Sequence, residues 1–158
     1  MGSRHVRPFL CALLAGLATM LPARAFAQLG ADVNSVARDV AKVKAPVIVK
    51  QTTRYTVREM MSASGSTVRQ FATPEGQIFA VAWEGPFHPD YQQLLGTYFD
   101  RLQQAMQQPA GERRARRAPV LIETPEFVFQ SFGHVRALAG RAFVPQMLPA
   151  GVGMEEIR

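Results

Sequence analysis

Two histidines and a nearby carboxylate are the side chains whose types and spacing come nearest to catalytic chemistry. His88 and Asp90 lie two residues apart beside prolines, and with His134 they could hold a zinc ion or serve a small hydrolase. No HExxH element accompanies them, and Ser131, three residues before His134, lies in no G-x-S-x-G or S-x-x-K motif. Asp90 can instead cap a helix while His88 bonds locally. The pattern favours a protein without catalytic residues, metal or cofactor, with a hydrolase or metal-dependent enzyme as the alternative.

Two arginines farther along the chain could serve binding. Arg136 and Arg141 are five residues apart, so a regular strand would point them to opposite faces, whereas a β-bulge at Gly140 would bring them to one face. On one face they could clamp a carboxylate or a phosphate. Internal ion pairs with Glu59 or Glu84 are the alternative.

Small residues surround these arginines, which leaves room for long polar side chains or for the backbone of a partner. We expect His134 and Arg136 to line a shared, partly exposed depression, with Trp83 or Tyr98 nearby. The candidate binding residues are therefore His134, Arg136, Arg141 and Trp83.

Alternating and apolar runs predict the strands that must position these side chains. The expected strands are 52–61, 67–73, 77–84, 127–132 and 135–144, with Gly133 as the last turn. The run at 77–84 (QIFAVAWE) is apolar almost throughout, which indicates a central strand covered on both faces. Simple alternation gives it a small-residue face of Ile78, Ala80 and Ala82 and a bulky face of Phe79, Val81 and Trp83.

Helical spacing of apolar residues predicts one long helix at 90–106 and one short helix at 32–44. We expect Leu95, Phe99 and Leu102 to be buried against the small-residue face. The short helix, a homodimer partner or an apolar ligand would then cover the bulky face. The predicted fold is α+β: an antiparallel sheet of about five strands with one long helix packed on it and a short N-terminal helix.

Basic residues gather in one polar stretch. Residues 107–119 contain Arg113, Arg114, Arg116 and Arg117, which predicts an exposed, mobile loop. The cluster could meet anionic lipid headgroups or an acidic partner, and a solvated loop is the simpler interpretation. The whole sequence has 18 basic and 12 acidic residues, a balance too mild to indicate nucleic-acid binding.

Residues 1–27 have the three parts of a Sec-type secretory signal peptide. Basic residues such as Arg4 precede the apolar run Phe9–Leu21, which is too short to span a membrane. Ala25 and Ala27 then supply the small residues of a cleavage site before Gln28. We therefore predict a periplasmic or secreted protein with a single domain at 28–158 and no transmembrane segment after processing.

Cleavage would change the charge and the thiol content. Removing Arg4, Arg7 and Arg24 leaves 15 basic against 12 acidic residues, a net charge of +3 in place of +6. Cys11, the only cysteine, would leave as well, so the mature chain would have no disulfide and no thiolate.

Two stretches of the sequence resemble a known family. One comprises FAVAWEGP at 79–86, Pro89-Asp90 and LLGTYF at 94–99; the other comprises GHVRALAGRAFVP at 133–145, LPAGV at 148–152 and a terminal EIR. Together they resemble the small exported proteins of Gram-negative bacteria grouped as domain of unknown function 2844. The resemblance implies an exported single-domain protein, and it implies no reaction because the family has no assigned activity.

These observations predict an exported, non-enzymatic binding or interaction module. Its partner would be a periplasmic or envelope protein or an anionic ligand, and a homodimer is a further option.

Overall fold

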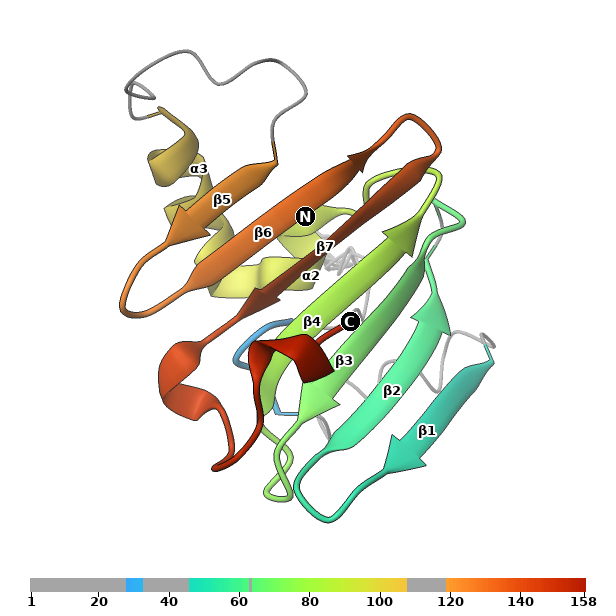
Figure 1. Cartoon of the computed structure of the whole chain (residues 1–158), viewed down its shortest axis with the longest axis vertical. Coiled ribbons are helices and arrows are strands. Elements are labelled where there is room, and N and C mark those ends of the chain that lie inside the picture. The colour runs from blue at the N-terminus through green and yellow to red at the C-terminus, as the bar shows by residue number, and fades with distance from the viewer. Residues whose placement is uncertain (1–27, 33–45, 63, 108–118) are drawn as a thin grey trace, which may run out of the picture.

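Within the described residues, seven antiparallel strands form one sheet in the order β1-β2-β3-β4-β7-β6-β5 (Figure 1). The computed structural model describes residues 28–32, 46–62, 64–107 and 119–158. The strands are β1 (Val47–Gln51), β2 (Thr56–Met61), β3 (Thr67–Ala72), β4 (Ile78–Gly85), β5 (Val120–Glu123), β6 (Val128–His134) and β7 (Ala137–Phe143). The apolar strand β4 lies at the middle of the sheet, as its composition predicts.

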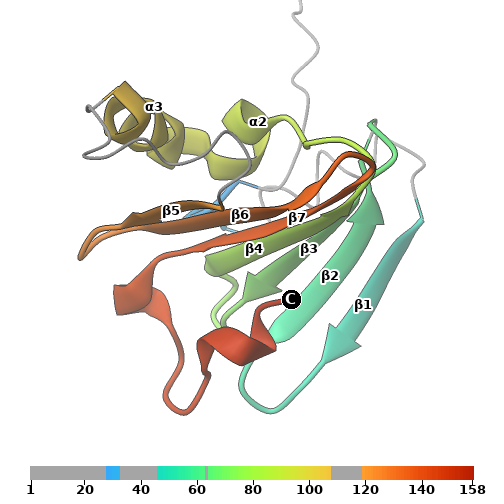
Figure 2. The ribbon, with the colours of Figure 1, turned by 45° about the horizontal axis from the view of Figure 1, so that its top comes forward.

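Helical segments cover one face of the sheet, and the irregular C-terminal segment covers part of the other (Figure 2). The segments α2 (Tyr91–Leu95), η1 (Gly96–Tyr98) and α3 (Phe99–Gln107) lie over one face, here called the helix face. The C-terminal segment, residues 145–157, lies over the other, here called the C-terminal face. This segment contains the short turns η2 (Pro145–Met147) and η3 (Met154–Glu156).

The helix face has an aromatic and aliphatic core. Leu94, Leu95 and Leu102 pack there with Val81 and Trp83, and all five side chains are buried. The predicted burial of Leu95 and Leu102 is confirmed, whereas Phe99 is only partly buried. This core is the larger of the two and holds the helical segments on the sheet.

The C-terminal face has a second core, which the C-terminal segment closes. Phe71, Phe79 and Phe143 of the sheet pack with Val152 and Ile157 of the segment. Ile157 is fully buried. The expected cover for the second face is a short N-terminal helix, a homodimer partner or an apolar ligand. Within the described residues the C-terminal segment covers it, and the expected helix lies outside these residues apart from Asp32.

A bulge in β4 reverses the predicted use of its two faces. Ala72 pairs with Ile78, and Phe71 pairs with Ala80, so Phe79 is the extra residue between them. Beyond it, the alanines face the C-terminal segment, while Val81 and Trp83 face the helices. The helices therefore pack on the bulky face rather than on the small-residue face, because helix-to-sheet spacing needs large side chains to fill it.

A glycine interrupts the predicted long helix. Asp90 caps its start by accepting a hydrogen bond from the Gln93 N–H, and Gly96, with φ of 56°, ends α2. The chain then passes through one 3-10 turn before α3 begins at Phe99. Gly96 allows this break because it adopts a positive φ without a Cβ penalty.

The predicted architecture of five strands, one long helix and a short N-terminal helix is wrong. Within the described residues the sheet has seven strands, and the helical stretch is short and interrupted. Prediction missed β1 and β5, the two outer strands. The predicted helix at 32–44 lies outside the described residues apart from Asp32, which forms an isolated bridge with Gln77. Of the predicted loop at 107–119, residues 108–118 also lie outside them.

The residues just after the predicted cleavage site belong to the domain. Leu29 is buried in the helix-face core, and its N–H donates to the Leu94 carbonyl. The Gly30 N–H donates to the Ile78 carbonyl, and the Ile78 N–H donates to Ala31. Gln28 itself is exposed.

Candidate functional site

The β6–β7 hairpin places two of the four predicted binding residues, His134 and Arg141, on the C-terminal face. His134 pairs with Ala137, Phe132 pairs with Ala139, and Gln130 pairs with Arg141. Alternation puts these six side chains on the same face as Val128 and Phe143, which belong to the C-terminal core. We call these six residues the hairpin strip.

The strip is largely exposed to solvent, and two of its six side chains are small. Phe132 is 47% exposed, and His134 and Ala137 are exposed, while Ala139 and Arg141 are half-buried. Two alanines therefore lie beside an exposed aromatic ring and an imidazole. Aromatic residues and arginine are enriched at interaction surfaces.

Arg141 joins the strip to the C-terminal segment. Its Nε donates to the Gln130 side-chain oxygen at 2.7 Å, and its Nη1 donates to the backbone carbonyls of Met154 and Ile157. These partners are neutral, so they satisfy donors of the guanidinium without cancelling its charge.

The two carboxylates predicted as partners of these arginines bind a third arginine. Arg69 Nε lies 2.7 Å from Glu59 Oε2, and Arg69 Nη2 lies 2.7 Å from Glu84 Oε1. The hydrogen bond from Arg69 lowers the pKa of the Glu59 carboxyl, and its bond with Glu84 helps raise the pKa of Arg69. Neither Arg136 nor Arg141 takes part in these pairs.

Arg136 lies apart from the strip, in the hairpin turn. Residues Val135 and Arg136 link β6 to β7, so the turn comes two residues after the predicted position at Gly133. Arg136 is exposed and has a φ of 68°, a left-handed conformation uncommon for a residue with a side chain. Neither of the two hollows described below has Arg136 or His134 in its lining.

Trp83 lies on the opposite face of the sheet. It is 2% exposed and packs in the helix-face core with ring centroids 5.3 Å from Tyr91 and 5.5 Å from Phe129. Gly140 is its cross-strand neighbour, and a Cβ there would lie 2.3 Å from the indole. Gly140 therefore makes room for Trp83, and the pairing of β6 with β7 runs past it without a bulge.

The candidate metal or hydrolase residues have separate local partners. His88 Nδ1 lies 2.6 Å from the Tyr91 hydroxyl, while Asp90 accepts the helix-capping bond. Burial raises the pKa of Tyr91. Ser131 shares the helix face with Trp83, whereas His134 points to the C-terminal face. Among the described residues, no group of three or more His, Cys, Asp or Glu side chains could hold a metal ion.

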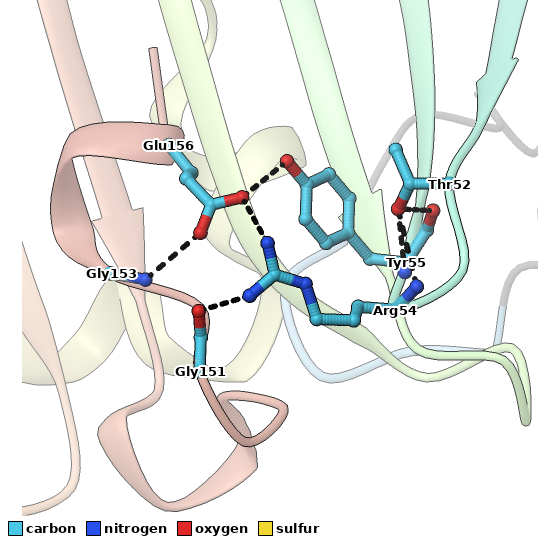
Figure 3. A network of polar contacts seen from close by, with 6 residues as sticks. All are labelled: Thr52, Arg54, Tyr55, Gly151, Gly153 and Glu156. Atoms are coloured by element: carbon cyan, nitrogen blue, oxygen red, sulfur yellow. Dashed lines mark hydrogen bonds and ion pairs between the residues drawn. The ribbon is translucent and has the colours of Figure 1, made fainter.

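A network of polar contacts fastens the C-terminal segment to the turn between β1 and β2 (Figure 3). Glu156 accepts a hydrogen bond from the Tyr55 hydroxyl at 2.9 Å. Its Oε2 also forms an ion pair with Arg54 Nη2 at 3.3 Å. Arg54 also donates to the Gly151 carbonyl. The bond from Tyr55 lowers the pKa of Glu156, and burial raises the pKa of Tyr55. The segment is thus held by Arg54 and Tyr55 on one side and by Arg141 on the other.

Sequence reasoning missed a pair of hollows between the helical layer and the β5–β6 turn. The first, about 340 Å³, is lined by Thr97, Tyr98, Arg101, Glu126, Val144 and Gln146. The second, about 310 Å³, shares Arg101 and Glu126, which form an exposed ion pair. No spacing in the sequence could reveal them, because α3 and the β5–β6 turn meet only through the fold.

Comparison with known proteins gives a family without an assigned activity. The family model described as "Protein of unknown function (DUF2844)" matches residues 25–157. The chain therefore belongs to this family, and the resemblance seen in the sequence is confirmed. No curated protein matches it, and no solved structure does. Within the described residues, no helix has the length and apolar character needed to cross a membrane.

Proposed function

We propose that this member of the DUF2844 family is an exported, non-enzymatic module that binds a protein partner through the hairpin strip. The observation that carries the proposal is the half-exposed Phe132 ring. It lies between His134 and Gln130 along β6, with Ala137 and Ala139 on the neighbouring strand. Single apolar side chains are commonly exposed on soluble proteins, so the proposal rests on the grouping of Phe132 with the other residues of the strip. Met154, also 47% exposed, belongs to the segment that Arg141 holds.

The charge of the strip favours a partner with an acidic group. Arg141 has neutral partners, and Arg136 is exposed at the adjoining turn. Glu84, the acidic side chain in the same row as Ala139, is engaged by Arg69, which also pairs with Glu59. A carboxylate beside an apolar side chain would therefore complement the strip.

The export part of the proposal rests on residues 1–27, with their basic start, apolar run and Ala25 and Ala27. N-terminal sequencing of the protein recovered outside the cytoplasm should return Gln28 as the first residue. An intact Met1 on a membrane-bound product would contradict this part of the proposal.

A photo-crosslinking amino acid at position 132 tests the binding surface. In the producing cell we expect a discrete adduct from position 132 and its loss when His134→Ala is added. Position 87 is the matched control, because Phe87 is 61% exposed and lies in the β4–α2 loop, outside the strip. Equal adducts from both positions, or none from position 132, would contradict the proposed surface.

A further inference from the structure

Within the part of the chain that the structure describes, strand β1 forms one outer edge of the sheet and has few of the features that keep edges unpaired. Its sequence, VIVKQ, contains no proline, and its five residues pair with β2 without a bulge. Ile48 is 55% exposed and Val49 is 56% exposed. Natural edge strands are usually protected by charges, prolines, bulges or a covering segment. Here Lys50 is the one charge in the strand.

The hydrogen bonds of the adjoining turn establish which backbone groups of β1 point outward. The Thr52 N–H donates to the Tyr55 carbonyl, so Thr52 directs its backbone toward β2. In an antiparallel ladder this direction alternates, so Lys50 and Ile48 also face β2. The N–H and C=O groups of Val47, Val49 and Gln51 therefore point away from the sheet.

We propose that two copies of this chain pair through β1, antiparallel, with Val49 of one copy opposite Val49 of the other. In this register the outward groups of Val47 meet those of Gln51 in the second copy, so all three outward residues form ladder bonds. The pairing joins the two sheets into one. It is independent of the proposed binding strip.

Side-chain charge is compatible with this register and disfavours one of its two neighbours. Lys50 faces Ile48 of the second copy, so no like charges oppose one another. In the second copy Ile48 pairs with Glu59, so only β1 of that copy separates Lys50 of the first copy from Glu59 of the second. Moving the strands by two residues toward Gln51 would place Lys50 opposite Lys50, which is unfavourable.

Sedimentation of the full chain gives the first test. Cys11→Ser is used as the background of all variants, so that the native sequence contributes no thiol. We expect a concentration-dependent dimer that Val49→Pro weakens at least tenfold. Proline removes an outward N–H, and edge strands tolerate proline at such positions. Val49→Thr, which keeps the N–H and the β-branched shape, is the matched control. A monomer at all concentrations up to about 1 mM would overturn the proposal, as would a dimer unaffected by Val49→Pro in a chain with native circular dichroism.

Cross-linking checks the register even if Val49→Pro fails to fold. Residues 48 and 50 form a non-hydrogen-bonded pair across the interface, with Cα atoms expected about 4.5 Å apart, a separation that a disulfide can span. The double variant Ile48→Cys with Lys50→Cys should form a covalent dimer on mild oxidation at least tenfold faster than Ile48→Cys alone. Equal rates would overturn the proposed register, and a dimer bridged by another protein would identify a different occupant and overturn self-pairing.

Discussion

The two faces of the sheet are closed by different means. Helical segments close the helix face through buried side chains such as Leu95 and Leu102 packed on Trp83 and Val81. The C-terminal segment closes part of the other face with few buried side chains and a set of hydrogen bonds from Arg54, Tyr55 and Arg141. Apolar packing on one face and polar fastening on the other predict different responses to mutation, to pH and to local opening.

The largest expected effect comes from the helix face. Leu95→Ala removes a fully buried side chain, and we expect it to lower the free energy of unfolding by about 2–5 kcal/mol. Gln92→Ala, on the exposed side of α2, is the matched control and should change stability by less than about 0.5 kcal/mol. Denaturant midpoints measure both. A loss within error for Leu95→Ala would show that the helices do not close this face.

Ile157→Ala should cost less, although Ile157 is equally buried. We expect a loss of about 2 kcal/mol, at the lower end for such a deletion, because the C-terminal segment can detach locally and so limits the cost. Hydrogen exchange measures the difference: in this variant, amides of 145–157 should exchange much faster while those of α2 and α3 change little. Uniform acceleration in both regions would mean that the two faces open as one unit.

Acid should weaken the C-terminal face first. Glu59 and Glu156 have pKa values below their ordinary value of 4.5, lowered chiefly by hydrogen bonds from Arg69 and Tyr55. A carboxylate whose folded pKa is below its unfolded pKa stabilises the fold above the unfolded value, and this contribution is lost as pH falls through the folded value. We therefore expect stability to fall below about pH 4.5, by a small amount because both carboxylates are partly exposed.

The double variant Glu59→Gln with Glu156→Gln should be less stable at pH 7 and should lose less stability between pH 5 and pH 3. Gln103→Ala, on the exposed surface of α3, is the control, because it changes no titratable group and should leave the pH profile unchanged. Denaturant midpoints across this range decide the matter, and parallel wild-type and double-variant profiles would contradict the assignment.

The smallest expected effect lies in the hairpin turn, outside both cores. Arg136→Gly should stabilise the domain by up to about 1 kcal/mol, because glycine adopts the observed positive φ without the Cβ clash. Arg136→Lys keeps the clash and should be neutral. Thermal unfolding midpoints compare them, and a marked loss for Arg136→Gly would indicate that the arginine side chain makes a stabilising contact.

Local patterns in the sequence predicted much of the sheet but not its arrangement. Alternation located β2, β3, β4, β6 and β7 to within a few residues. Strand β1 was missed because five residues between Pro46 and a turn carry too little alternation, and β5 was missed because it follows the arginine-rich stretch. Such short outer strands are defined by pairing with β2 and β6, which depends on contacts far along the chain.

The candidate site depended on register, which residue spacing alone did not provide. Trp83 and Arg141 were grouped as one site, yet Trp83 pairs with Gly140, so its neighbour Arg141 must point to the other face. The bulge at Phe79 likewise exchanged the faces assigned to Ala80 and Val81. Chemistry was better predicted where it was local, as in the capping of α2 by Asp90 and the local hydrogen bond expected of His88, whose partner is Tyr91.

The positions of Leu29 and Ile157 have a consequence for the order in which the protein matures. Leu29 lies in one core and Ile157 in the other, and β4 needs β7, which is made more than 50 residues later, as its neighbour. A chain delivered from its N-terminus therefore cannot complete the second core until residue 157 has emerged. On the proposed export route, the second core would therefore form only after residue 157 has passed through the membrane.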